Sequence, residues 1–101
     1  MRYKHIFILY FIKYSIGCST DDVVNFFKMH PFLKYYKNID KEIFMLIQSG
    51  LCIGVSTQTQ DHPYNYSDII ITIKGLEAIY WIKCIPIIKE IIQIIKIIIP
   101  S

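Results

Sequence analysis

The segment from residue 46 to residue 79, LIQSGLCIGVSTQTQDHPYNYSDIIITIKGLEAI, constrains the fold more than any other part of this chain. Two short apolar runs, residues 51–55 and 68–73, predict strands, and the polar stretch between them predicts a turn. Gly50 precedes the first strand, at a position where helices commonly end on a residue in the left-handed conformation. Thr72 can accept a backbone hydrogen bond and so begin another helix. The segment therefore predicts a helix end, a β-hairpin and a helix start, in that order.

Three helices are predicted ahead of this hairpin, at residues 3–16, 20–30 and 39–49. The first is apolar nearly all round, so we expect it to be central and well buried. Ser19 is followed three residues later by Asp22, a pattern close to a capping box for the second helix. Asn38 stands before the third helix, where an asparagine side chain can cap the first turn.

Two further helices are predicted after the hairpin, at residues 74–84 and 87–99, separated by Pro86. Isoleucine accounts for 24 of the 101 residues, more than one small core can bury, and much of it lies in the last helix. We therefore expect residues 1–84 to form a domain, and residues 85–101 to join its core, an oligomer interface, or both. The residues expected to make the contacts of a homodimer are Trp81, Ile88, Ile91, Ile92, Ile95 and Ile98.

Three helices, a β-hairpin and one or two C-terminal helices make up an α+β fold, the winged helix-turn-helix. Many bacterial winged-helix regulators carry a motif of the form L-x-x-x-G-L before the hairpin, or wing, and L-T-x-K-G-x-x-x-L after it. The matching residues here are Leu46, Gly50 and Leu51, followed by Ile71, Thr72, Lys74, Gly75 and Ile79. The two motifs lie a hairpin apart and follow three helices, so together they predict a winged helix.

The chain most resembles the YjcQ-like family, small phage-associated winged-helix proteins of low-GC bacteria. The resemblance runs from about Ile43 through Lys96 and includes Ile53-Gly54-Val55, the turn residues 61–64, and the helix start at Thr72, Lys74 and Gly75. It is less clear over the first 40 residues. The resemblance implies a winged-helix fold and a role in transcription or in the control of a phage or mobile element.

A basic window is the candidate surface for double-stranded DNA. Residues 28–41 hold four lysines against one aspartate, a net charge of +3. In a winged helix the third helix enters the major groove, and residues near its N-terminus reach the bases. The residues expected near base edges are Asn38, Lys41 and Met45. Those expected at phosphates are Lys28, Lys34, Lys37 and Tyr36, with Tyr35 as an alternative to Tyr36. In the wing, the residues expected to contact DNA are His62, Tyr64 and Tyr66.

Two features of the same sequence weaken the DNA hypothesis. The predicted wing tip carries no lysine or arginine and is flanked by Asp61 and Asp68, which makes a poor phosphate clamp. Arg2 is the only arginine, although arginine paired with guanine is the commonest base-specific contact. If the chain does not bind DNA, the lysines of the basic window are simply solvated surface side chains, and Asn38 is only an N-cap. The alternative function is a winged-helix module that binds a protein partner.

The distribution of reactive side chains argues against an enzyme or a metal protein. The three cysteines and three histidines are dispersed, without zinc-ligand spacing or a nucleophile–base pair, so we expect no cofactor. The odd number of separated cysteines favours reduced thiols and a cytoplasmic protein. No uncharged apolar run is long enough to span a membrane, and lysine is sparse in the Ile-rich tail, so membrane association is not expected.

Overall fold

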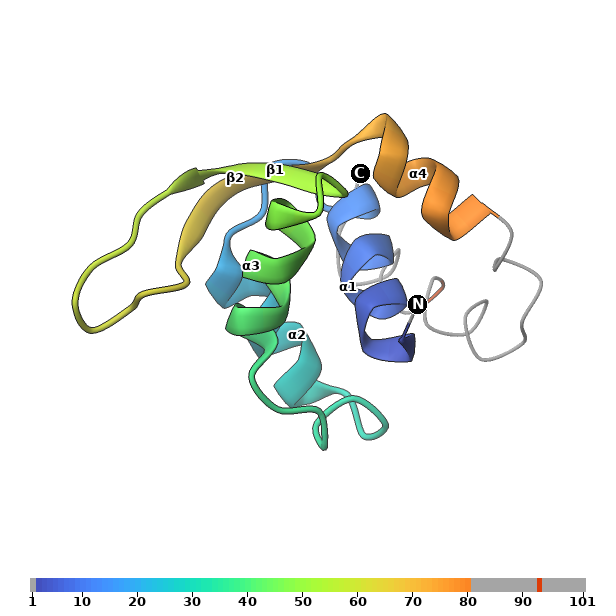
Figure 1. The fold of residues 1–101 in the computed structure, drawn as a ribbon. Coiled ribbons are helices and arrows are strands. Elements are labelled where there is room, and N and C mark those ends of the chain that lie inside the picture. The colour runs from blue at the N-terminus through green and yellow to red at the C-terminus, as the bar shows by residue number, and fades with distance from the viewer. Residues whose placement is uncertain (1, 81–92, 94–101) are drawn as a thin grey trace.

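The computed structural model describes residues 2–80 and residue 93. Within this part, four helices and a two-stranded antiparallel sheet follow one another along the chain (Figure 1). They are α1 (Tyr3–Tyr14), α2 (Thr20–Met29), α3 (Ile39–Gln48), β1 (Cys52–Ser56), β2 (Tyr66–Ile71) and α4 (Ile73–Tyr80). The α+β class is confirmed, as is the predicted order of elements up to residue 80, and the arrangement is compatible with a winged helix. Apart from residue 93, the tail at residues 85–101 lies outside the described residues, as do all six predicted dimer contacts.

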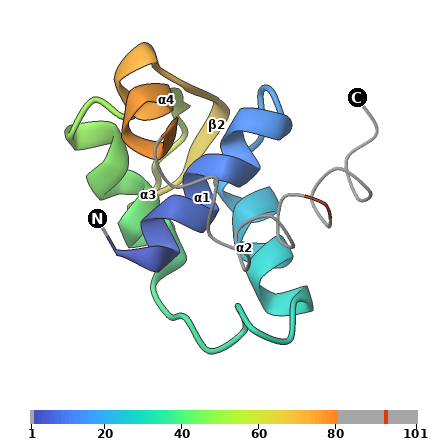
Figure 2. The ribbon, with the colours of Figure 1, turned by 90° about the vertical axis from the view of Figure 1, so that its right-hand side faces the viewer.

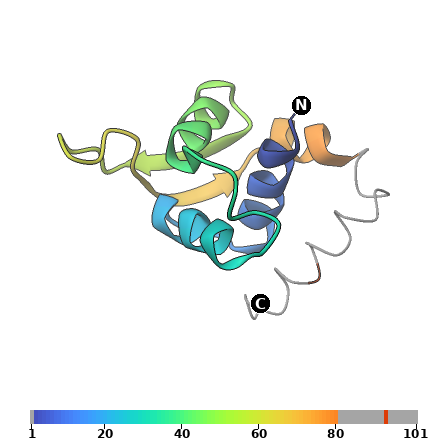
Figure 3. The same ribbon diagram turned by 90° about the horizontal axis from the view of Figure 1, so that it is seen from below.

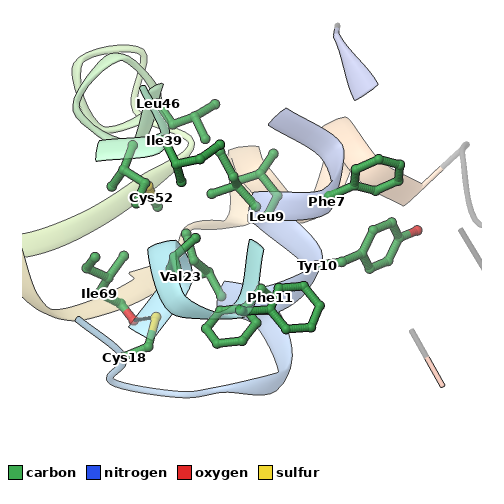
Figure 4. Packing of buried hydrophobic residues seen from close by; sticks show 14 of the residues in the cluster. Phe7, Leu9, Tyr10, Phe11, Cys18, Val23, Ile39, Leu46, Cys52 and Ile69 are labelled. Carbon is green, nitrogen blue, oxygen red and sulfur yellow. Dashed lines mark hydrogen bonds between the residues drawn. The ribbon is translucent and has the colours of Figure 1, made fainter. Parts of the chain in front are cut away.

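Helix α1 is the centre of the core. Figure 2 shows it between α2, α3 and α4, and Figure 3 shows the sheet running between α2 and α3. Seven consecutive residues of α1, Ile6 to Ile12, are buried, which confirms the prediction of a helix covered on all sides. Leu9 and Phe11 lie among buried side chains from α2, α3 and both strands (Figure 4). Helices α2, α3 and α4 and strand β2 are therefore each positioned against this helix.

The start of α2 is fixed by the predicted capping box. The Ser19 hydroxyl accepts a hydrogen bond from the backbone N–H of Asp22 at 3.2 Å. The Asp22 carboxylate in turn accepts from the backbone N–H of Ser19 at 2.9 Å. These two bonds satisfy donors that a helix start leaves free, so the first residues of α2 hold a defined position.

The start of α3 differs from the prediction. Asn38 occupies the N-cap position, but its side chain makes no capping hydrogen bond, so the predicted side-chain cap is wrong. Its backbone is left-handed, with φ of 59° and ψ of 41°. Asparagine tolerates this conformation better than most residues, so Asn38 serves to turn the chain into α3.

The end of α3 and the start of α4 are joined at one point. Gly50 has φ of 78°, and the N–H of Leu51 donates to the carbonyl of Leu46 at 3.0 Å, which ends α3 in a Schellman motif. The Lys74 ammonium donates to the carbonyl of Ser49 at 2.9 Å. Gly75 is buried, and a Cβ added there would lie only 2.1 Å from the carbonyl oxygen of Leu51. The motif before the hairpin and the motif after it therefore meet in one contact, between the end of α3 and the start of α4.

A β-bulge shapes the hairpin. Ile53 pairs with Ile70 and Val55 pairs with Ser67, so β2 has one more residue than β1 between these pairs. Asp68, one of the two residues of β2 that lie opposite Gly54 in this bulge, is left-handed with φ of 51°. The bulge interrupts the alternation of faces, and two residues three apart in β2, Tyr66 and Ile69, both become buried. Strand β2 therefore begins two residues earlier than the apolar run 68–73 predicted.

Candidate nucleic-acid interface

A hollow of about 440 Å³ lies between α2, the loop that follows it, the start of α3 and the hairpin loop, residues 57–65. We call it the lysine hollow. The hairpin loop projects past α2 and α3 (Figure 3). The residues that line the hollow are Thr20, Asp21, Val24, Phe27, Lys28, Lys34, Tyr36, Lys37, Asn38, Ile39, Asp40, His62, Tyr64 and Asn65.

The lysine hollow gathers seven of the ten residues that the sequence predicts to contact DNA. These seven are Lys28, Lys34, Tyr36, Lys37, Asn38, His62 and Tyr64. They come from three separate segments of the chain, so the fold brings them together. This convergence distinguishes the hollow from a scatter of solvated surface groups.

Three predicted residues lie elsewhere. Lys41 and Met45 are exposed on α3, outside the hollow, and Met45 is 47% exposed. Tyr66 belongs to the core, with 6% exposure, and its hydroxyl accepts a hydrogen bond from the Gln58 side chain at 3.1 Å. The prediction that Tyr66 is a DNA-contacting residue of the wing is corrected by this burial, which follows from the bulge in β2.

The charges in the hollow are mixed. Its three lysines, at positions 28, 34 and 37, are exposed and form no ion pair with any described residue. The Lys34 ammonium lies 5.3 Å from the centre of the Tyr35 ring, a cation–π contact. Two carboxylates, Asp21 and Asp40, also line the hollow, so its charged side chains sum to +1.

Two tyrosines of the hollow are held by aromatic neighbours. The Tyr36 ring lies edge-on to Phe7 and Phe27, with ring centres 6.2 and 6.1 Å apart. The Tyr64 ring centre lies 5.1 Å from that of Phe44 on α3. The second contact ties the hairpin loop to α3, so the two walls of the hollow are in fixed relation to each other.

Sequence reasoning missed the carboxylate that orients α3. Glu42 is 7% exposed and forms ion pairs with Lys4, at 2.7 Å, and with His5. Burial alone would raise the pKa of Glu42, but the hydrogen bonds from Lys4 and His5 outweigh it and the pKa is lowered. Its position, three residues after Ile39 and next to Ile43 on the buried stripe, was the available signal. The cluster fixes α3 against α1.

Sequence reasoning also missed a residue that joins the hollow to the hairpin. The Thr20 hydroxyl accepts a hydrogen bond from the backbone N–H of Tyr66 at 2.9 Å. Thr20 is the first residue of α2, so the bond ties the N-terminal end of α2 to the base of the hairpin loop. No local pattern indicates this contact, because the two residues are 46 positions apart.

The other reactive side chains do not converge on the hollow. Among the described residues, no group of three or more His, Cys, Asp or Glu could hold a metal ion. Cys18 and Cys52 are buried free thiols, and burial raises the pKa of Cys52 to about 12. His30 is buried, and its Nδ1 accepts a hydrogen bond from the N–H of Phe32 at 3.1 Å.

Two negative results complete the description. No helix in the described part of the chain is long and apolar enough to cross a membrane. No family model, curated protein or solved structure matches this chain. The interpretation of the lysine hollow therefore rests on the residues that line it.

Proposed function

We propose that this chain is a small winged-helix protein that binds double-stranded DNA through α3 and the lysine hollow. The observation that carries the proposal is the convergence of Lys28, Lys34 and Lys37 on one concave face, beside α3 and the hairpin loop. The order of three helices, hairpin and fourth helix supports the winged-helix fold. Unpaired ammonium groups from separate segments suit contact with a phosphate backbone.

The exposed face of α3 is the part that enters the major groove in this proposal. Lys41 and Met45 are exposed there, and Lys37 precedes the helix by two residues. Lys28 and Lys34 contact phosphates. With Arg2 as the only arginine, backbone contacts dominate and base-specific contacts are few, so affinity depends strongly on salt concentration.

The proposed biological role is control of transcription, or of a phage or mobile element, in the cytoplasm. The resemblance to the YjcQ-like family motivates this role. The protein acts as a homodimer in this proposal, because its Ile-rich tail carries more apolar surface than one small core can bury. Sedimentation equilibrium at micromolar concentration tests the dimer, and a monomeric mass would contradict it.

The DNA proposal is tested by fluorescence anisotropy with a labelled duplex of mixed sequence at low salt. The double variant Lys34→Gln/Lys37→Gln is compared with Arg2→Gln/Lys13→Gln, which removes the same charge from residues outside the hollow. We expect the first pair to weaken binding strongly and the second to weaken it little. Absence of binding by the wild type, or equal effects of the two pairs, would contradict the proposal.

A protein-interaction module is the second candidate. The outer face of the hairpin exposes three apolar side chains, Ile53, Val55 and Ile70, and the hairpin loop carries no lysine or arginine. An apolar, weakly charged face of this kind suits a protein partner. Co-purification of one specific partner, lost in Ile53→Ser/Val55→Ser, together with no retention of DNA, would favour this function.

A further inference from the structure

The two ends of the lysine hollow carry different chemistry. Asp21 and Lys28 both line it from α2 and are seven residues apart, which is about 10 Å along a helix axis. The Asp21 end adjoins the hairpin, because the neighbouring Thr20 is hydrogen-bonded to Tyr66. The Lys28 end adjoins the loop that carries Lys34. The hollow therefore has Asp21 at its hairpin end and Lys28 and Lys34 at its other end.

The hairpin end has the groups that recognise a nucleobase. Tyr64 lines this end while its ring is held against Phe44, so it offers an aromatic surface for stacking. Asn65 lies next to it and supplies an amide with both donors and an acceptor. The Asp21 carboxylate can accept hydrogen bonds from the exocyclic amino group of a base.

The mixed charge argues against a site for phosphate alone. The hollow contains Asp21 and Asp40, whose carboxylates would repel a phosphate backbone that filled it. A nucleotide offers an anionic phosphate at one end and amino-bearing base edges at the other, so it satisfies both signs of charge. The volume of about 440 Å³ falls in the range of small-molecule sites, about 300–1,000 Å³.

We infer that the lysine hollow binds one unpaired nucleotide, with its base at Tyr64 and Asp21 and its phosphate at Lys28 and Lys34. The inference deepens the proposed function and rests on it, since DNA held across α3 would deliver the nucleotide. The same chemistry exists in a free nucleoside monophosphate, which the experiment must separate from a nucleotide within DNA.

Three ligands distinguish these sources: a perfect duplex, the same duplex with a single unpaired adenosine bulged from one strand, and free deoxyadenosine monophosphate. We expect the bulged duplex to bind about tenfold more tightly than the perfect one, the effect of one stacked base. Displacement of the bulged duplex by millimolar deoxyadenosine monophosphate would show that the hollow also accepts the free nucleotide. Lack of displacement would show that the hollow binds only nucleotides that are part of DNA.

Variants of Tyr64 test the assigned end of the hollow, with the ratio of the two duplex affinities as the readout. Tyr64→Leu, which keeps an apolar contact with Phe44 but removes the aromatic surface, should reduce the ratio to near one. Tyr64→Phe should preserve it. Tyr3→Leu is the matched control, because Tyr3 is exposed and stacks on Phe7 in α1. Should Tyr64→Leu fail to fold, as judged by circular dichroism, Asp21→Ala serves in its place.

The outcomes separate this inference from the proposed function. If the wild type binds the two duplexes equally, the inference is overturned while DNA binding stands. If it binds neither duplex, both are overturned. Retention of the full ratio in folded Tyr64→Leu or Asp21→Ala would also overturn the inference, because the assigned residues would then have no part in the preference.

Discussion

The hydroxyl of Thr72 donates a hydrogen bond to the backbone carbonyl of Gly50 at 2.6 Å, 22 residues earlier in the chain. The same oxygen accepts a hydrogen bond from the N–H of Gly75 at 3.1 Å. One side chain therefore both satisfies a carbonyl left free at the end of α3 and caps the start of α4. These hydrogen bonds join the residue that follows the hairpin to the residue near its start, and α4 begins at that point.

Replacing Thr72 should destabilise the protein by removing both bonds. Thr72→Val keeps the shape of the side chain, so we expect it to lower the free energy of unfolding by about 1–2 kcal/mol. Thr72→Ser keeps the hydroxyl and should cost clearly less. Urea denaturation followed by circular dichroism measures both variants, and equal losses for the two would show that the hydroxyl is not responsible.

Gly75→Ala should be more harmful than its small size suggests. The added Cβ would lie 2.1 Å from the carbonyl oxygen of Leu51, so α4 must move away from the end of α3. Overpacking of this kind costs about 1–3 kcal/mol of unfolding free energy. Glu77→Ala, an exposed change in the same helix, is the control and should leave the urea midpoint almost unchanged. A comparable midpoint for both variants would contradict the close approach.

Acid should weaken the contact between α1 and α3. The pKa of Glu42 in the folded protein lies below its ordinary value of 4.5, so its carboxylate stabilises the fold above that pH. This stability is lost as the pH falls through the lowered folded pKa. We expect Glu42→Gln to be less stable than the wild type at pH 7 by about 1.5–3 kcal/mol, because hydrogen bonds to a charged group are lost.

The difference between wild type and Glu42→Gln should shrink as the pH falls below about 4.5 and through the lowered pKa of the folded protein, where the wild-type carboxylate becomes protonated. Urea midpoints measured between pH 7 and pH 3 test this narrowing. A gap that stays constant over the whole range would mean that the Glu42 charge does not contribute to stability.

The buried thiols should react only when the protein opens. Burial raises the pKa of Cys18 and brings that of Cys52 to about 12, so at pH 8 only about one Cys52 in 10⁴ is a thiolate. In a Cys84→Ser background, we expect a thiol reagent such as Ellman's to label almost nothing in native buffer and two cysteines per chain in urea. Rapid native labelling of either cysteine would show that the core opens readily.

The salt dependence of DNA binding should report the number of lysines in contact with phosphate. Each phosphate contact contributes about 0.9 to the slope of log K against log salt concentration on a duplex. Lys34→Gln/Lys37→Gln should therefore reduce the magnitude of that slope by about 1.8 if both lysines contact phosphates. Anisotropy titrations at several salt concentrations measure the slope. A weaker affinity with an unchanged slope would mean that the two lysines act indirectly.

The elements that local chemistry determines were predictable from sequence. Ser19 and Asp22 form the expected capping box, and Gly50 takes the left-handed conformation expected of a residue that ends a helix. Each depends on hydrogen bonds within a few residues, so the pattern of side chains is sufficient. The central position of α1 was also predictable, because its apolar residues leave no face for solvent.

The errors have physical causes that a local pattern does not contain. The bulge at Asp68 breaks the two-residue repeat, so the start of β2 and the burial of Tyr66 were missed. Asn38 turns the chain into α3 through its left-handed backbone, while its side chain makes no capping hydrogen bond. Half of the residues that line the hollow, seven of fourteen, were predicted as DNA contacts, but no local pattern indicates that Asp21 and Asp40 lie among them. Their shared position depends on how the helices pack.

The burial of α1 has a consequence for the synthesis of the protein. Of the described elements, this helix leaves the ribosome first, yet Tyr10 donates a hydrogen bond to the carbonyl of Ile79, 69 residues later. A nascent chain that ends before α4 therefore leaves exposed the part of α1 that α4 covers. Because α1 is made before the elements that cover it, chains that end before α4 should aggregate more readily than chains that contain it.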